Sequence, residues 1–255
     1  MFTFDMPQEE KPEIFGIPID NRSQDELERV IGDCLYGTTF TRIATVNPEF
    51  LVRARRDAAF ADVLRVADIR IVDGSGIVLA GLLSGVGIAR YPGADLMRFI
   101  LSKAEQSGAS VFCAIMKSGL SSYDQVREAL LASYPKLVLD GSDIDPESET
   151  TPAGIRETSV VLCNFGAPEQ ERFLESLRAN SGNIRLVMGV GGSFDFLTGK
   201  RRRAPRWLRV LGLEWLFRFA IQPARAGRIW TAVVIFPFFW LSDRMKSRKQ
   251  KTDNK

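Results

Sequence analysis

The chain has 255 residues, of which 45% are hydrophobic and 25% charged, a balance that is typical of globular proteins and excludes wholesale disorder. It contains no histidine, which excludes histidine general bases, Ser-His-Asp triads and the usual zinc enzymes. The three cysteines form no CxxC pair, which argues against a disulfide framework and indicates a reducing compartment.

Charge is distributed unevenly along the chain. Residues 200–255 contain 15 Lys and Arg against 3 Asp and Glu, a net charge of +12, whereas the whole chain carries +3. The rest of the chain therefore carries the difference, −9. A strongly basic C-terminal segment on an acidic body indicates an anionic partner, which could be phosphate, lipid or nucleic acid.

The N-terminal segment 1–13 is acidic, and we expect it to be flexible. It has no basic region followed by an apolar run, so no signal peptide is expected. No stretch of about 18 apolar residues occurs in the sequence, so no ordinary membrane-spanning helix is expected either.

Strand-like and helix-like patterns alternate from residue 14 onward. Ile14–Asp20 predicts a strand, and Ser23 with Glu26 predicts a capping box that opens an amphipathic helix to about Leu35. A β-rich run over Phe40–Val46 ends in Asn47-Pro48, the pattern of an N-cap and a first helical residue. Further strands are predicted over Ile69–Val72, Ser110–Ile115, Leu137–Leu139, Val160–Phe165 and Ile184–Val190, and helices over Ala94–Gln106, Ser121–Ser133 and Pro168–Arg178.

This alternation predicts an α/β fold, Rossmann-like, with a mostly parallel sheet and helices on both faces. We expect a core over residues 14–200 and a basic, partly apolar helical appendage over residues 201–255. Asp140–Ser159 is polar and is interpreted as a connection between elements. In such folds ligands bind beyond the carboxyl ends of the strands, where the connecting loops gather.

Polar residues follow three of the predicted strands. Thr45 and Asn47 are two apart and leave the end of one strand on the same face. Asp73 follows an apolar-rich run, and Gln170 and Glu171 lie in the first turn of the helix after another strand. Taken singly, Asp73 could be an N-cap and Glu171 could complement a helix dipole. Their convergence at one edge of the sheet favours a binding site instead.

Two glycine-rich turns could bind phosphate through backbone N–H groups, or could be plain tight turns. Gly189–Phe194, which contains Gly191 and Gly192, follows a strand, and Gly74–Leu79 follows Asp73. Both lack the third glycine of a dinucleotide fingerprint, and no P-loop pattern occurs in the chain.

The ordered set of motifs resembles the WecG/TagA/CpsF glycosyltransferases, glycosyltransferase family 26. The matching segments span roughly residues 14–230. They are Thr45-Val46-Asn47-Pro48-Glu49, Val72-Asp73-Gly74-Ser75-Gly76, Arg90-Tyr91-Pro92-Gly93-Ala94-Asp95-Leu96, Gly166-Ala167-Pro168-Glu169-Gln170-Glu171, Gly189-Val190-Gly191-Gly192-Ser193-Phe194-Asp195-Phe196, Arg203-Ala204-Pro205, Leu213-Glu214-Trp215, Arg218, Pro223, Arg225 and Arg228.

The resemblance implies metal-independent transfer of a hexosyl unit, with inversion, from a UDP-sugar to a polyprenyl-diphosphate-linked glycan in surface-polysaccharide synthesis. The family's sugars are N-acetylmannosamine, its uronic acid, or glucose. By position, Asp73 is the expected general base, and Thr45, Asn47, Arg90 and Gln170 are expected to line the pocket. No cofactor is expected, and the expected location is the cytoplasm, at the inner face of the cell membrane.

Physical chemistry agrees with this assignment. An inverting transferase needs one carboxylate to accept the proton of the attacking hydroxyl, and the UDP leaving group needs its developing charge offset. Without a metal, arginines must supply that positive charge, and Arg218, Arg225 and Arg228 are the candidates. Arg225 and Arg228 are spaced to share a helix face, although a solvated basic face is the alternative interpretation.

The chain departs from the family pattern at two places. Ala114–Gly119 replaces a Gly-Gly turn that is expected to face the nucleotide, and Glu169 replaces a usual lysine. Either change could alter donor preference.

In addition, Asp143-Ile144-Asp145 is a literal DxD, the metal–diphosphate signature of other glycosyltransferase folds. Its neighbours favour an ordinary acidic turn, and no metal site is expected there.

Ile229–Leu241 is mostly apolar, contains Trp230 and Trp240, and is followed by basic residues. It would be too short to cross a bilayer, and Pro237 would interrupt it. The composition predicts a segment that lies at the membrane interface, with a helix docked on the core as the alternative.

Two other functions remain open: a nucleotide-dependent oxidoreductase, which the incomplete fingerprints oppose, and a nucleic-acid-binding protein, which no recognised motif supports.

Overall fold

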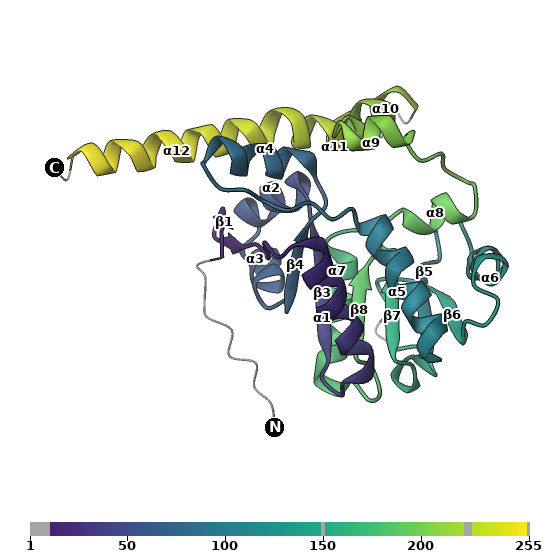
Figure 1. Cartoon of the computed structure of the whole chain (residues 1–255). Coiled ribbons are helices and arrows are strands. Elements are labelled where there is room, and N and C mark those ends of the chain that lie inside the picture. The colour runs from purple at the N-terminus through teal and green to yellow at the C-terminus, as the bar shows by residue number, and fades with distance from the viewer. Residues whose placement is uncertain (1–10, 149–150, 222–225, 254–255) are drawn as a thin grey trace.

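The structure is a computed structural model, and it describes residues 11–148, 151–221 and 226–253, without the side chains of Val210, Arg218 and 247–253. A six-stranded sheet lies at its centre (Figure 1), with the strand order β4-β3-β8-β7-β5-β6 and parallel pairing throughout. The strands are β3 (Thr41–Val46), β4 (Ile69–Val72), β5 (Val111–Met116), β6 (Leu139–Ile144), β7 (Val160–Cys163) and β8 (Leu186–Gly189). Their carboxyl ends therefore share one edge, and the predicted α/β fold is confirmed.

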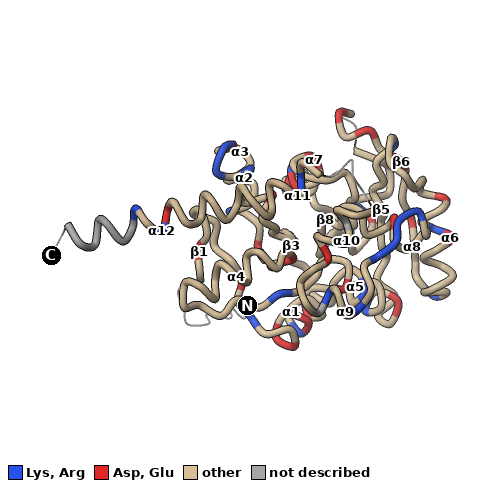
Figure 2. The backbone as a smooth tube through the Cα atoms, turned by 90° about the horizontal axis from the view of Figure 1, so that it is seen from above, with Lys and Arg blue, Asp and Glu red and all other residues tan. Residues whose placement is uncertain are grey.

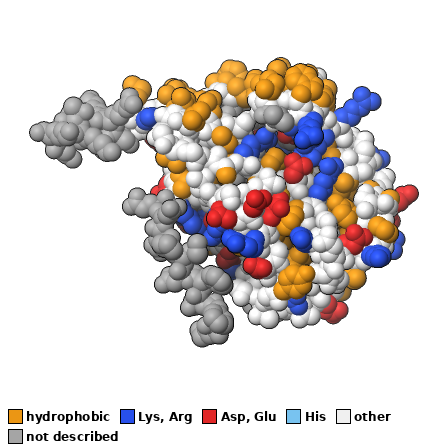
Figure 3. All heavy atoms as spheres, in the orientation of Figure 1, with side chains coloured by type: hydrophobic (Ala, Val, Ile, Leu, Met, Phe, Trp, Pro, Cys, Tyr) orange, Lys and Arg blue, Asp and Glu red, His pale blue; other side chains and the backbone are white. Residues whose placement is uncertain are grey.

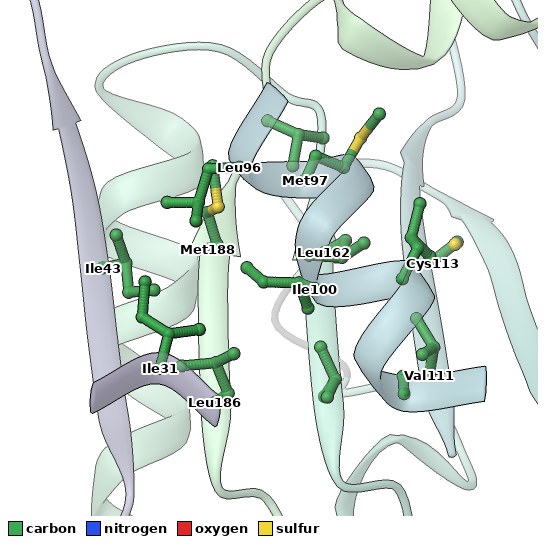
Figure 4. Close-up of a cluster of buried hydrophobic side chains, with 14 of the residues drawn as sticks. Ile31, Ile43, Leu96, Met97, Ile100, Val111, Cys113, Leu162, Leu186 and Met188 are labelled. Carbon is green, nitrogen blue, oxygen red and sulfur yellow. The ribbon is translucent and has the colours of Figure 1, made fainter. Parts of the chain in front are cut away.

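Helices cover both faces of this sheet, because successive strand residues point to opposite sides. Ile43 of β3 belongs to the cluster in Figure 4, whereas its neighbour Ala44 belongs to a cluster on the other face. The first face is covered by α1 (Gln24–Tyr36), α5 (Gly93–Ser107), α6 (Tyr123–Ser133) and α8 (Ser193–Leu197). The second is covered by α2 (Pro48–Arg56), α3 (Ala58–Arg65), α4 (Ser75–Leu83) and α7 (Glu169–Ser176), which the 3₁₀ turn η2 (Leu177–Asn180) extends.

The predicted helix starts are confirmed in atomic detail. The Ser23 hydroxyl accepts a hydrogen bond from the Glu26 N–H, and the Glu26 carboxylate accepts one from the Ser23 N–H, which completes the capping box of α1. The side-chain Oδ1 of Asn47 caps α2 by accepting from the Phe50 N–H at 3.0 Å. These caps satisfy N–H groups that have no partner inside the helix.

Two strand predictions need correction. The predicted strand Ile14–Asp20 is instead a short antiparallel hairpin of β1 (Glu13–Ile14) and β2 (Ile17–Pro18), which turns at Phe15 and Gly16 with positive φ angles. The strand predicted over Leu137–Leu139 is β6, Leu139–Ile144. The first residues of Asp140–Ser159, which was predicted to be a connection, therefore belong to the edge strand of the sheet. Beyond it, the described residues contain a 3₁₀ turn, η1 (Ile155–Glu157). Residues 1–10 of the N-terminal segment 1–13, which was predicted to be flexible, lie outside the described residues.

The C-terminal segment lies over the carboxyl edge of the sheet (Figure 1). It contains α9 (Arg206–Val210), α10 (Glu214–Ile221), α11 (Ala226–Trp230), a π-helical turn η4 (Thr231–Ile235) and α12 (Phe236–Asp253). The expected interruption at Pro237 is wrong. The Phe236 N–H donates to the Thr231 carbonyl five residues back, and this wider turn lets the helix continue through a residue without an N–H.

One face of η4 and α12 packs against the body of the protein. Phe236 is buried, and its ring contacts that of Phe15 edge-on with centroids 5.7 Å apart. Asp243 forms a two-pronged ion pair with Arg55 of α2, in which the Nη2–Oδ1 distance is 2.9 Å. The docked-helix interpretation therefore holds for this inner face. Among the described residues, no helix is long and apolar enough to cross a membrane.

Candidate active site

Asp73 stands at the carboxyl end of β4, next to the start of α5. Its N–H donates to the Val46 carbonyl at 2.9 Å, and its Oδ1 accepts from the Gly93 N–H at 3.0 Å. The N-cap of the following helix α4 is Gly74, without a side-chain hydrogen bond, so Asp73 does not cap that helix. Its carboxylate is instead held at the N-terminus of α5, where the helix dipole stabilises a negative charge.

Thr45 and Asn47 lie beside Asp73 on the neighbouring strand. β3 pairs with β4 so that Val46 is level with Val72, which brings the two strand ends together. A Cβ on Gly74 would lie 2.4 Å from Pro48 Cδ, so the chain needs glycine at this close approach. The sheet register thus brings Thr45, Asn47 and Asp73 close together at the carboxyl ends of two neighbouring strands, as the strand-end pattern predicted.

Gln170 lies in the first turn of α7, which packs on one face of the sheet. Its side chain is buried, its Oε1 accepts from the Gly166 N–H at 3.1 Å, and its Nε2 donates to Glu171 at 3.0 Å. A Cβ on Gly189 would lie 2.3 Å from Gln170 Nε2, so the glycine at the end of β8 makes room for the amide. Both ends of the Gln170 amide therefore have protein partners.

Glu171 connects that amide to the buried Arg42 of β3. Both charged side chains are fully buried, and Arg42 Nη1 lies 2.9 Å from Glu171 Oε2. Burial raises the pKa of the Glu171 carboxyl, although the charge of Arg42 opposes this shift. The dipole interpretation of Glu171 is incomplete, because its carboxylate is the centre of a chain from Arg42 to Gln170.

Arg90 links Asp73 to the C-terminal segment. Its Nε donates to the Asp73 carbonyl at 2.7 Å, and its Nη1 donates to the Arg209 carbonyl at 3.2 Å. Its Nη2 also lies 3.7 Å from the carboxylate of Glu214 in α10. The structure thus places Arg90 at the expected edge, with its guanidinium between the loop after β4 and the helices that cover it.

The other predicted site residues are partly described. Gly191 has a positive φ of 49°, and Gly192 is the N-cap of α8 at the end of β8. Arg228 pairs with Glu49, two residues after Asn47, at 2.6 Å, which brings α11 to the same edge. Arg225 and the side chain of Arg218 lie outside the described residues.

Charged residues to which the sequence analysis gave no role in the site join this edge to the appendage, although Asp95 and Arg203 belong to the family's motifs. Asp95, in the first turn of α5, contacts Arg203 at 2.7 Å and Arg209 at 3.7 Å. Burial tends to raise the pKa of Asp95, but the hydrogen bond and charge of Arg203 outweigh it, so the pKa is lowered. Figure 2 shows the run of Lys and Arg between α8 and α9 to which Arg203 belongs.

Asn164 was also missed. It follows the apolar run of β7, and its Oδ1 accepts from the Met116 N–H at 2.7 Å, which ties together the ends of β7 and β5. The strand predicted over Val160–Phe165 placed Asn164 inside the strand, but β7 ends at Cys163, so Asn164 is a strand-end residue like Asp73. Beside it lies Ala114–Gly119, the segment that departs from the family pattern. It comprises the end of β5 and a tight turn in which the Gly119 N–H donates to the Met116 carbonyl.

The DxD lies on the opposite border of the sheet, because β6 and β4 are its two outermost strands. Asp143 belongs to β6 and accepts from the Tyr123 N–H at the start of α6, at 2.9 Å. Asp145 accepts from the nearby Glu147 N–H at 3.1 Å. The acidic-turn interpretation is therefore wrong for Asp143, which is a strand residue, and the described residues contain no cluster of three or more His, Cys, Asp or Glu that could hold a metal.

Comparison with known proteins is consistent with this geometry. The model of the glycosyl transferase WecG/TagA/CpsF family matches residues 12–251. An N-acetylglucosaminyldiphosphoundecaprenol N-acetyl-beta-D-mannosaminyltransferase of Bacillus subtilis (strain 168) is 28% identical over 215 residues, which cover 82% of this chain and 81% of the relative.

A protein with the same description from Staphylococcus aureus (strain NCTC 8325 / PS 47) is 28% identical over 248 residues, which cover 94% of this chain and 96% of the relative. One from strain MRSA252 of that species is 29% identical over 252 residues, with the same coverage. The family match favours a transferase over the oxidoreductase alternative. Since the match extends over most of its length, the chain belongs to the WecG/TagA/CpsF family of glycosyl transferases.

Proposed function

We propose that the protein transfers one hexosyl unit from a UDP-sugar to a polyprenyl-diphosphate-linked glycan in the synthesis of a surface polysaccharide. The unit is N-acetylmannosamine, its uronic acid, or glucose. The observation that carries this proposal is the carboxylate of Asp73, held at 3.0 Å from the N-terminal amide of α5, next to the end of the strand that carries Thr45 and leads into Asn47. The relatives' names support an acceptor that is linked to a polyprenyl diphosphate.

In the proposed reaction, the acceptor hydroxyl attacks the anomeric carbon while the bond from that carbon to the UDP oxygen breaks. The proton of the hydroxyl passes to Asp73, and UDP leaves with an additional negative charge. Thr45, Asn47, Arg90 and Gln170 are proposed to shape the pocket, and the N–H groups at Gly191 and Gly192 to face phosphate. Arg218, Arg225 and Arg228 are proposed to offset the charge on UDP.

The direct test uses the purified full-length chain, a panel of UDP-sugars and an N-acetylglucosaminyl diphosphate carried on a short prenyl chain. Mass spectrometry should find the acceptor heavier by one hexosyl unit, with an equal amount of UDP released. UDP release without any glycosylated product, for every sugar tested, would contradict the proposal.

We expect transfer to persist in excess EDTA, because arginines rather than Mg²⁺ offset the diphosphate charge. Removing one well-placed donor to such a charge costs about 10²–10³ in turnover. The triple variant in which glutamine replaces Arg218, Arg225 and Arg228 should therefore have a far lower transfer rate than the double variant Asp143→Ala with Asp145→Ala. Strong inhibition by EDTA that Mn²⁺ relieves would reverse this ranking and assign the DxD to catalysis.

We also propose that the C-terminal segment attaches the enzyme to the cytoplasmic face of the membrane. Each basic residue near an anionic surface contributes about 1 kcal/mol, and exposed apolar side chains add hydrophobic attachment. Salt alone should release part of the protein from anionic vesicles, and deletion of residues 229–255 should release nearly all of it. Activity on long polyprenyl acceptors should fall more than activity on short, soluble ones.

Deletion also removes the buried Phe236, so a second variant keeps the inner face intact. Phe238, Leu241 and Met245 are exposed, and their replacement with glutamine leaves the contacts of Phe236 in place. Equal pelleting of this variant, the deletion and the wild type with vesicles would mean that the tail is only a docked helix.

A further inference from the structure

Helix α4 has a composition that is unusual for a surface helix. Its nine residues, Ser75–Leu83, include no charged side chain. Ile77, Ala80 and Gly81 face the core, whereas Leu79, Leu82 and Leu83 are 56%, 69% and 54% exposed. A surface helix ordinarily turns a polar face to water, and a contiguous apolar patch marks a contact site.

The exposed face of α4 continues onto the C-terminal helices. A Cβ on Gly76 would lie 3.9 Å from the Phe236 ring, and Arg244 Nη1 bonds to the Leu83 carbonyl and lies 3.2 Å from Ser84 Oγ. The two segments therefore run side by side in the same direction, as Figures 1 and 2 also show.

The outer face of the tail is apolar too. Val234, Phe238, Leu241 and Met245 are exposed and are spaced by four, three and four residues, which places them on one side of the helix. Both helices pack on the body by their opposite faces, through Ala80 and Phe236, so both outer faces point away from it. Figure 3 shows hydrophobic side chains along this end of the molecule.

We propose that Leu79, Leu82 and Leu83 of α4 form a second lipid-contacting element, which inserts into the interface of an anionic bilayer beside the tail. Trp207 of α9 and Trp230 of α11, in the same C-terminal segment as the tail helix, are exposed, as are the basic residues Arg206 and Lys246 of that segment. Tryptophan and basic residues around an apolar surface fit the boundary between lipid headgroups and acyl chains. Two copies of this basic surface would instead repel each other.

This contact would fix the height of the candidate active site above the membrane. α4 begins two residues after Asp73, and its nine residues extend over about 12 Å. Insertion of its far end therefore turns the carboxyl edge of the sheet toward the headgroup layer, where the diphosphate of a lipid-linked acceptor lies. The inference rests on the proposed function in this respect, because it takes the acceptor to be lipid-linked.

The test compares two triple variants with the wild type by co-sedimentation with vesicles of phosphatidylglycerol and phosphatidylcholine. The α4 variant carries Leu79→Gln, Leu82→Gln and Leu83→Gln. The control carries Tyr36→Gln, Val66→Gln and Val138→Gln, which replace side chains that are 73%, 54% and 54% exposed and that precede strands, at the opposite edge of the sheet. All six positions are exposed, so we expect both variants to fold, which thermal melting checks.

We expect the α4 variant to bind vesicles about tenfold more weakly or worse, since three leucines lose their transfer out of water, and the control to bind like the wild type. Transfer to a long-chain acceptor in vesicles should fall in parallel, while transfer to a short soluble acceptor is retained. Equal pelleting of the α4 variant and the wild type would overturn the inference. So would a wild-type oligomer, seen by gel filtration without lipid, that only the α4 variant loses, because the leucines would then contact a second copy.

Failure of the proposed function has a different signature. In that case the wild type transfers no sugar to any acceptor, whereas vesicle binding still depends on the α4 leucines, which supports the lipid contact by itself.

Discussion

Replacing Asp73 with asparagine should lower the turnover number by about 10²–10⁴, the usual contribution of a general base. The substitution removes the proton acceptor but keeps an oxygen in the position that accepts from the Gly93 N–H at 3.0 Å. The fold and the affinity for UDP should therefore remain close to those of the wild type. Initial rates at saturating substrate, together with calorimetric titration of UDP, measure the two effects separately.

A matched control is Asp62→Asn, which removes an exposed carboxylate that pairs with Arg65 on α3. This variant should retain the turnover of the wild type. If Asp73→Asn also retains it, Asp73 is not the base. If it loses UDP binding along with turnover, its carboxylate contributes to the fold of the pocket rather than to proton transfer.

Replacing Arg42 with methionine should lower the free energy of unfolding by about 3–5 kcal/mol, because it leaves an uncompensated buried charge. Arg42 is fully buried, bonds to Glu171 at 2.9 Å and to Glu175 at 2.7 Å, and also donates to the Val63 carbonyl. Urea denaturation measures the loss. The double variant Arg42→Met with Glu171→Leu should recover much of it, because no lone buried charge remains.

Arg178→Met provides the comparison. Arg178 also pairs with Glu175, and with Asp68, but its side chain is 33% exposed, so we expect a loss of about 1 kcal/mol or less. Equal losses for the two single variants would mean that burial of the Arg42–Glu171 pair has no energetic weight.

The strand-end residues could be found in the sequence because a parallel sheet turns a local pattern into a spatial one. Each short apolar run gives a strand, and all carboxyl ends meet at one edge, so Thr45, Asn47 and Asp73 had to lie close together. Local reasoning could not decide what Asp73 does there. Its partner, the Gly93 N–H, is 20 residues away and comes from a different helix.

Other features have no local signal. β6, Leu139–Ile144, contains two aspartates and a glycine, and only its place at the border of the sheet tolerates so polar a strand. A Cβ on Gly141 would lie 2.5 Å from the Cys113 carbonyl, a constraint that becomes visible only when β5 is alongside. Helix α4 has no polar face, so its apolar residues show no period from which a helix could be predicted.

The position of Arg90 depends on contacts across 119 residues of sequence. The resemblance indicated that Arg90 belongs to the site, but not that its guanidinium joins the Asp73 loop to Glu214 and to the Arg209 carbonyl. Likewise, the apolar run of the tail, with Trp230 and Trp240 and the basic residues that follow it, predicted an interfacial segment. It could not indicate that Phe236 packs into the core while Phe238 is exposed.

The central claim is a single displacement at the anomeric carbon, with Asp73 accepting the proton of the attacking hydroxyl. The anomeric configuration of the product, read by NMR from the one-bond carbon–hydrogen coupling of the newly attached sugar, tests it most directly. Starting from a UDP-α-sugar, the account predicts a β linkage, because one displacement inverts the centre. An α linkage would contradict it, since retention requires a covalent intermediate or attack from the side of the leaving group.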